Sequence, residues 1–149
     1  SDSSELDTSD TLGENTIMIA NGDDTLYINS DNGIISFYGS YTGDIDNESV
    51  ELSFGESAES PFTFSTSINE DSSSTFTLNG LLTTQIESVD YSITFSNYRL
   101  TLLETSNQIE GTITATTDSQ SFRIVFSGSE ATYTVYNGDS VVDSGTMLL

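Results

Sequence analysis

The stretch Val89–Glu104 reads VDYSITFSNYRLTLLE, and its pattern decides the fold class. Apolar side chains occupy every second position from Val89 to Phe95, and the same alternation resumes after a break at Ser96-Asn97. Successive side chains of a β-strand point to opposite faces, so this period of two predicts strands with one buried face. We interpret the stretch as a hairpin in the middle of an all-β domain.

The same alternation recurs outside this stretch and predicts further short strands. They cover Thr16–Ala20, Thr25–Asn29, Ile34–Tyr41, Ser49–Phe54, Phe62–Ile68, Thr75–Thr83, Ile109–Thr116, Ser121–Ser127, Ala131–Tyr136 and Val141–Leu148. Asn32-Gly33 is a strong hairpin-turn signal, whereas Asn79-Gly80 indicates either a small hairpin or a bulged strand. About ten to twelve strands and no helical period predict an antiparallel β-sandwich whose C-terminal half is a meander. A closed up-and-down β-barrel is the alternative.

The domain organisation follows from a change in composition near residue 15. Residues 15–149 carry the strand pattern and suit a single all-β domain. Residues 1–14, SDSSELDTSDTLGE, are acidic and have no apolar period, so they are predicted to form a flexible tether or to become ordered by pairing with a neighbouring subunit. Their composition resembles the spacer that follows a cleaved signal or a lipidated cysteine in bacterial surface proteins.

The charge balance excludes several classes of partner. The chain has 24 acidic residues, two basic residues (Arg99 and Arg123) and a formal charge of −22. Such a field repels the phosphates of nucleic acids and the anionic surface of a membrane. No apolar run approaches the roughly 18 residues that a transmembrane helix needs. A cationic partner, a divalent metal or a salty environment fits this charge better.

Missing residue types remove much of the usual enzyme chemistry. The sequence contains no Cys, no His and no Lys, so it offers no thiolate nucleophile, no Ser-His-Asp triad and no Schiff-base lysine. We therefore predict a protein that is not an enzyme.

One acidic stretch has the residue types of a metal site. Asp44, Asp46 and Glu48 alternate within a predicted loop. Calcium binds several hard oxygen ligands, which loops rich in Asp and Asn can supply. The three acids are the candidate metal ligands, and calcium is the candidate cofactor. The glycine and the terminal glutamate of an EF-hand loop are absent at the corresponding positions, and the other interpretation is a solvated acidic loop.

Asp143-Ser144-Gly145, preceded by two valines, resembles the Asp-Thr/Ser-Gly signature of aspartic proteases. That family uses two aspartates that share a proton, and its fold continues well beyond the motif. Here three residues follow Thr146, and a second copy of the motif is missing. The alternative is a last strand with an outward aspartate and a bulge at the glycine.

Together these features predict an extracellular, cell-surface or periplasmic β module from a bacterium or another microbe, with a lipid tether as one mode of attachment. The expected role is adhesion, assembly or envelope structure, with self-association, another surface protein or a glycan as the partner. A small β-barrel that binds an apolar ligand is the alternative function, and a hydrolase that uses carboxylates is the third. Salt or calcium is expected to stabilise the protein, since either reduces repulsion among the acids.

Overall fold

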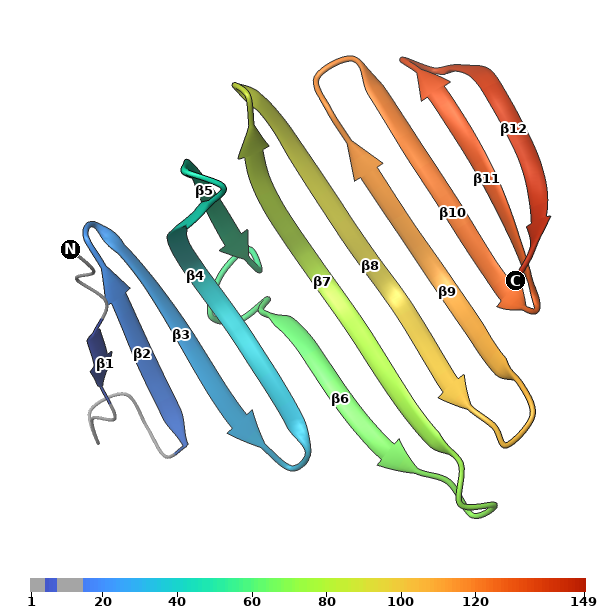
Figure 1. Ribbon diagram of the computed structural model, residues 1–149, viewed down its shortest axis with the longest axis horizontal. Helices are drawn as coiled ribbons and strands as arrows, with labels where there is room; N and C mark the ends of the chain where they lie inside the picture. The colour runs from blue at the N-terminus through green and yellow to red at the C-terminus, as the bar shows by residue number, and fades with distance from the viewer. Residues whose placement is uncertain (1–4, 8–14) are drawn as a thin grey trace.

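The computed structural model describes residues 5–7 and 15–149, and every regular element within them is a β-strand (Figure 1). The twelve strands are β1 (Glu5–Asp7), β2 (Thr16–Asn21), β3 (Asp24–Asp31), β4 (Ile34–Ile45), β5 (Glu48–Phe54), β6 (Phe62–Ile68), β7 (Ser74–Ile86), β8 (Val89–Leu102), β9 (Asn107–Thr116), β10 (Gln120–Gly128), β11 (Glu130–Asn137) and β12 (Ser140–Leu148). Residues 5–7 of the predicted tether pair with β2, and its other residues lie outside the described part of the chain. The predicted all-β class is confirmed.

The strands form one continuous antiparallel sheet. Its hydrogen-bonded order is β1-β2-β3-β4-β5-β7-β8-β9-β10-β11-β12, so β7 to β12 make the predicted C-terminal meander. Among the described strands, β1 and β12 lie at opposite ends of this order, and the sheet is not a closed barrel (Figure 1). The arrangement is consistent with a meander and with one layer of the predicted sandwich.

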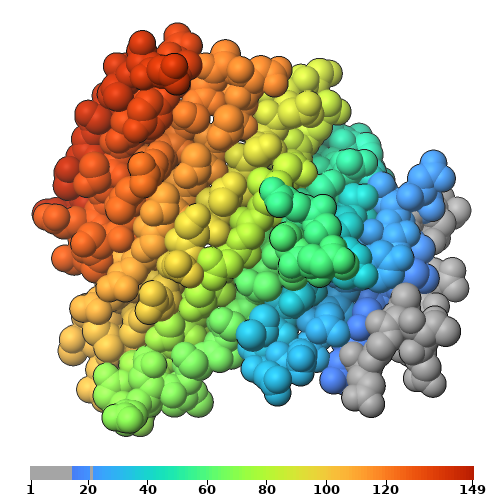
Figure 2. All heavy atoms as spheres, turned by 180° about the vertical axis from the view of Figure 1, so that it is seen from behind, coloured from blue at the N-terminus to red at the C-terminus, as the bar shows by residue number. Residues whose placement is uncertain are grey.

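β5 and β6 share a single row between β4 and β7. Residues 39–45 of β4 pair with β5, and residues 34–37 pair with β6. Between the two strands, residues 55–61 leave the sheet as a loop that stands on one of its faces (Figure 2). The N–H of Gly55 donates to the carbonyl of Leu81 at 2.7 Å, and the N–H of Glu56 donates to the carbonyl of Ser60 at 2.9 Å. These bonds fix the start of the loop at the end of β5.

The stretch Val89–Glu104 does not form the predicted hairpin. Residues 89–102 are one strand, β8, and its register with β9 shifts between Ser96 and Arg99. One residue more on β8 than on β9 makes this a β-bulge, at which Asn97 adopts a positive φ of 48°. The bulge moves the alternation by one position, so the apolar residues before and after it stay on the same face. A break in the period is thus the mark of a bulge here, and sequence alone does not distinguish it from a turn.

The register divides the side chains between two very different faces. We call one the apolar face: it carries Phe54, Leu82, Ile93, Ala115, Phe122 and Val135, which are successive register neighbours from β5 to β11. The opposite side is the polar face: one position along the same strands, it carries the register neighbours Ser53, Thr83, Ser92, Thr116 and Ser121. The two faces differ because apolar and polar residues alternate along each strand, and successive side chains point to opposite faces.

The sheet is one layer thick over its described residues. Only three of their hydrophobic side chains are buried: Leu26 and Phe62, each 8% exposed, and Ala131, 1% exposed. A domain normally buries its apolar surface between two packed layers. Here the other side chains of the apolar face are half-buried against their neighbours within the sheet or exposed.

Six rings on the apolar face form a continuous line, which we call the aromatic row. Consecutive centroid distances are 5.7 Å, 5.8 Å, 5.6 Å, 6.0 Å and 5.3 Å along Phe37, Phe54, Phe62, Phe95, Tyr98 and Phe126. All five distances lie in the range of favourable aromatic pairs, most of them edge to face. The row crosses the sheet from β4 to β10 and joins its two halves without a second layer.

Three hairpins repeat one pattern. Their sequences are YGSYTGDIDNESVELSF (38–54), NGLLTTQIESVDYSITF (79–95) and EGTITATTDSQSFRIVF (110–126). In each one the glycine is the register partner of the final phenylalanine, a threonine follows the glycine three positions later, and the glycine has a φ between 102° and 120°. The spacing is shared because the three hairpins have the same length and each begins at a glycine with a positive φ.

Gly111 is tightly constrained by the neighbouring strand. Its φ is 102°, and a Cβ there would lie 2.2 Å from the carbonyl oxygen of Asn97 in the bulge of β8. Neither the conformation nor the space suits another residue. Gly43 provides a contrast, because its φ is not positive and the nearest atom to a Cβ is in the ring of Tyr41 at 3.4 Å.

We expect Gly111→Ala to lower the free energy of unfolding by about 1–3 kcal/mol, because it adds backbone strain and a clash with the neighbouring strand. Gly43→Ala is the matched control and should leave stability unchanged or slightly raised. Urea unfolding followed by circular dichroism measures both. Equal midpoints for the two variants would contradict this account of the repeated glycine.

Candidate functional site

The structure does not gather the three predicted metal ligands. Asp46 and Asn47 are the two central residues of the β4–β5 turn, with φ of 52° and 67° as in a type I′ hairpin. The register pairs Asp44 with Ser49 and Ile45 with Glu48, so the side chains of Asp44 and Glu48 point to opposite faces of the sheet. In the described part of the chain, no group of three or more acids is placed to hold a metal ion. Stabilisation by calcium stays a prediction.

The aspartate of the Asp-Ser-Gly motif lies in the edge strand β12. Asp143 is exposed, and its Oδ1 accepts a hydrogen bond from the N–H of Ser144 at 2.9 Å. The extra residue of this strand is Val142, since Val135 pairs with Asp143 and Tyr136 with Val141. Gly145 lies under the ring of Tyr133, where a Cβ would come within 2.8 Å of that ring. The glycine therefore makes room for an aromatic side chain and does not form the bulge expected there.

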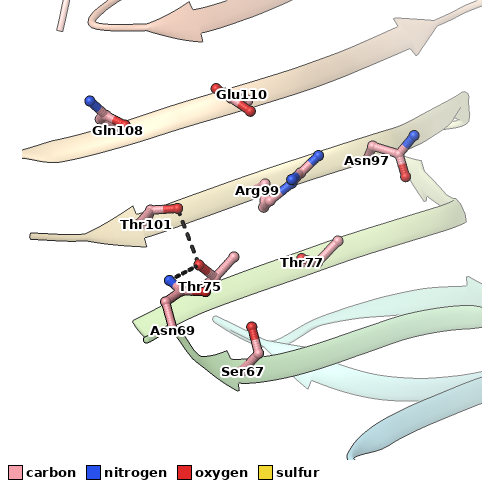
Figure 3. A pocket seen from close by; sticks show the side chains of 9 residues that line it. All are labelled: Ser67, Asn69, Thr75, Thr77, Asn97, Arg99, Thr101, Gln108 and Glu110. Atoms are coloured by element: carbon pink, nitrogen blue, oxygen red, sulfur yellow. Dashed lines mark hydrogen bonds between the residues drawn. The ribbon is translucent and has the colours of Figure 1, made fainter. Parts of the chain in front are cut away.

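Arg99 lies on the polar face, in an open depression of about 440 Å³ (Figure 3). Its register partners are Thr77 on β7 and Glu110 on β9, which places a carboxylate one strand away from the guanidinium. Beside it, Thr75 accepts a hydrogen bond from Asn69 Nδ2 at 2.9 Å and lies 3.3 Å from the hydroxyl of Thr101. The remaining lining residues are Ser67, Asn97 and Gln108. The depression is a hydroxyl- and amide-lined surface with one positive and one negative side chain.

Two further depressions on the polar face are also open; the first is mostly polar and the second exposes slightly more apolar than polar surface. One is lined by Glu51, Ser53, Thr83, Thr84, Gln85, Asp90, Tyr91 and Ser92. The other lies beside the 55–61 loop and is lined by Glu56, Glu59, Ser60, Pro61, Asn79, Gly80, Leu81 and Thr94. Both contain hydroxyls, amides and carboxylates that can hydrogen-bond, and the second also contains Pro61 and Leu81. Asp143 lines none of the three depressions.

The apolar face is the larger candidate site, although the sequence pattern alone predicts only a core for its residues. Its margins are open to solvent: Ile86 is 49% exposed, Val89 40%, Leu102 40% and Met147 41%. A contiguous exposed apolar surface is a candidate site of contact with another molecule. The alternation of apolar and polar residues already indicates such a face. It does not tell whether the layer that covers the face comes from the same chain or from another.

Among the described strands, β12 forms an open edge of the sheet. β12 lies at one end of the strand order, and all of its side chains except Gly145 are exposed. An edge strand presents backbone N–H and C=O groups to which another strand can pair. The sequence contains no lysine, the residue that most often discourages such pairing, so carboxylates such as Asp143 are the charges that remain at this edge.

Comparison of the chain with protein-family models, with curated proteins and with solved structures finds no match. Among the described residues there is no helix that is long and apolar enough to span a membrane.

One carboxylate has a perturbed acidity. In the loop between β6 and β7, Oδ1 of Asp71 accepts hydrogen bonds from the hydroxyl of Ser73 at 2.5 Å and from its N–H at 3.0 Å. These bonds favour the charged form, and they lower the pKa of Asp71 from its ordinary value of 3.8. The contribution to stability is present above the unfolded pKa and is lost as the pH falls through the lower, folded pKa.

We expect the carboxyl carbon of Asp71 to titrate below pH 3.8 in a carbon-detected NMR titration. Ser73→Ala removes the side-chain donor and should move that midpoint upward, while Ser57→Ala, in the loop on the polar face, should not. An unchanged midpoint in Ser73→Ala would show that the hydroxyl is not the cause.

Proposed function

We propose that this protein is a non-enzymatic surface module that acts in assembly or adhesion and uses its sheet as a scaffold for contact with other proteins. The observation that carries the proposal is a one-layer sheet with one apolar and one polar face. An isolated sheet of this kind leaves apolar surface in water, so contact with another surface is a source of stability. The open edge at β12 offers a second route, in which strands of neighbouring molecules pair.

Composition supports placing this module outside the cell or at its surface. A charge of −22 favours a soluble monomer in a salty or extracellular setting, and the absence of Cys fits a bacterial exterior as well as a reducing cytosol. Hydroxyls of the Ser/Thr-rich polar face offer donors and acceptors for hydrogen bonds with a glycan or another protein. A microbial extracellular, cell-surface or periplasmic setting is the one we propose.

The alternative of a small apolar ligand inside a barrel fits less well. Such a barrel needs its first and last strands to pair, and here the described strands β1 and β12 are the two ends of the order. A carboxylate hydrolase is supported less still, because Asp143 is exposed on an edge strand and lines none of the three depressions.

We expect salt to promote both stability and association. The Debye length falls from about 30 Å at 0.01 M to about 3 Å at 1 M ionic strength, which screens repulsion among the acids within and between molecules. The melting temperature and the light scattering of the protein should both rise from low to high NaCl. A melting temperature that is flat with salt and a monomer under every condition would contradict the assembly role.

Calcium is a separate prediction with its own control. If the β4–β5 hairpin binds calcium, millimolar CaCl₂ should raise the melting temperature more than MgCl₂ of equal ionic strength. The triple variant Asp44→Asn, Asp46→Asn, Glu48→Gln should remove that difference while keeping the response to NaCl. Equal effects of the two salts on the parent protein would mean that screening alone acts.

A further inference from the structure

We propose that the apolar face is covered by the apolar face of a second copy of this chain, so that two identical sheets form one β-sandwich. The inference rests on the proposed assembly function and names the partner of that surface. The two copies would be related by a two-fold axis, and each would contribute the same residues to the contact.

The first argument is that the given residues supply no other apolar layer. The given residues outside the described part, 1–4 and 8–14, contain one large apolar side chain, Leu12, and no aromatic residue. They cannot cover a surface with the six rings of the aromatic row. A broad apolar layer is needed, and the apolar face itself is one.

The second argument is area. Eight neighbouring strands, spaced about 4.8 Å apart and each contributing about 20 Å of length, give a footprint on the order of 800 Å². A stable interface buries about 800 Å² on each partner. The apolar face therefore has the size that a stable dimer requires, and two sheets can pack face to face about 10 Å apart.

The third argument is the placement of charge. From β4 to β12, only Glu48 and Asp143 put a carboxylate on the apolar face by register, one beside a turn and the other on the edge strand. Other acids of these strands, such as Asp44, Asp90 and Glu110, lie on the polar face. Face-to-face pairing thus buries an uncharged centre and leaves the charge of both copies in solvent, where salt screens it.

Neighbouring residues in β9 allow a direct test. Ala115 lies on the apolar face between Ile93 and Phe122, and Thr114 lies on the polar face between Thr94 and Arg123. Both are half-buried in one chain. The sequence has no Cys, so Ala115→Cys and Thr114→Cys each introduce one thiol, with little change in volume. Far-UV circular dichroism checks that both variants fold.

Sedimentation equilibrium measures the mass, and maleimide labelling at high and low protein concentration measures the access of each thiol. We expect a species of twice 16.1 kDa. In it, Ala115→Cys should react about tenfold more slowly when about nine chains in ten are paired, and dilution should restore the rate. Thr114→Cys should react at the same rate at both concentrations.

The outcomes separate the pairing from the assembly function. Assemblies in which Ala115→Cys stays reactive would overturn the pairing and leave assembly through the edges. Protection of Ala115→Cys in a species of monomer mass would also overturn it, because the chain would then cover its own face. A protected dimer that forms nothing larger and adheres to nothing would contradict the assembly function alone.

Discussion

The hydrogen-bond register of the sheet is the constraint on which the rest of the structure depends. Because side chains alternate across a strand, a slip of one residue would exchange the apolar and polar faces. Each row of register partners, such as Phe54, Leu82, Ile93, Ala115 and Phe122, keeps one chemical character across several strands. Where β8 carries an extra residue, its apolar positions shift by the same one residue, so the face stays continuous through the bulge.

The repeated hairpin shows how this register is maintained. A glycine with a positive φ stands opposite a phenylalanine in three hairpins, and two of those rings, Phe54 and Phe95, flank Phe62 in the aromatic row. Glycine kinks and aromatic partners are devices that curve a sheet and hold its register. Comparison of the chain with itself could have revealed the repeat, since the glycine, the threonine and the final phenylalanine recur at one spacing. Repeats of this kind cannot bury their own apolar faces and depend on their neighbours.

The functional proposal follows from what this arrangement leaves unpaired. The acidic hairpin that attracted attention in the sequence has a two-residue turn, and its carboxylates diverge because alternation points Asp44 and Glu48 to opposite faces. The apolar face, in contrast, brings side chains from distant parts of the chain together on one surface. An acidic scaffold whose one face carries few charges is suited to contact with another layer, and the second copy that we propose would match it in size and charge.

The sequence by itself determined most of the strands and turns and the division into apolar and polar residues, because these depend on local periodicity and turn chemistry. It did not indicate β1, and it predicted a hairpin where β8 is one strand. It also marked the break at Ser96-Asn97, although it could not tell a bulge from a turn. Only the tertiary structure decided that β5 and β6 share one row, that Arg99 faces Thr77 and Glu110, and that one layer is all the described chain provides. These features rest on pairing between strands far apart in sequence, and an alternating pattern is the same whether its apolar face meets its own chain or another.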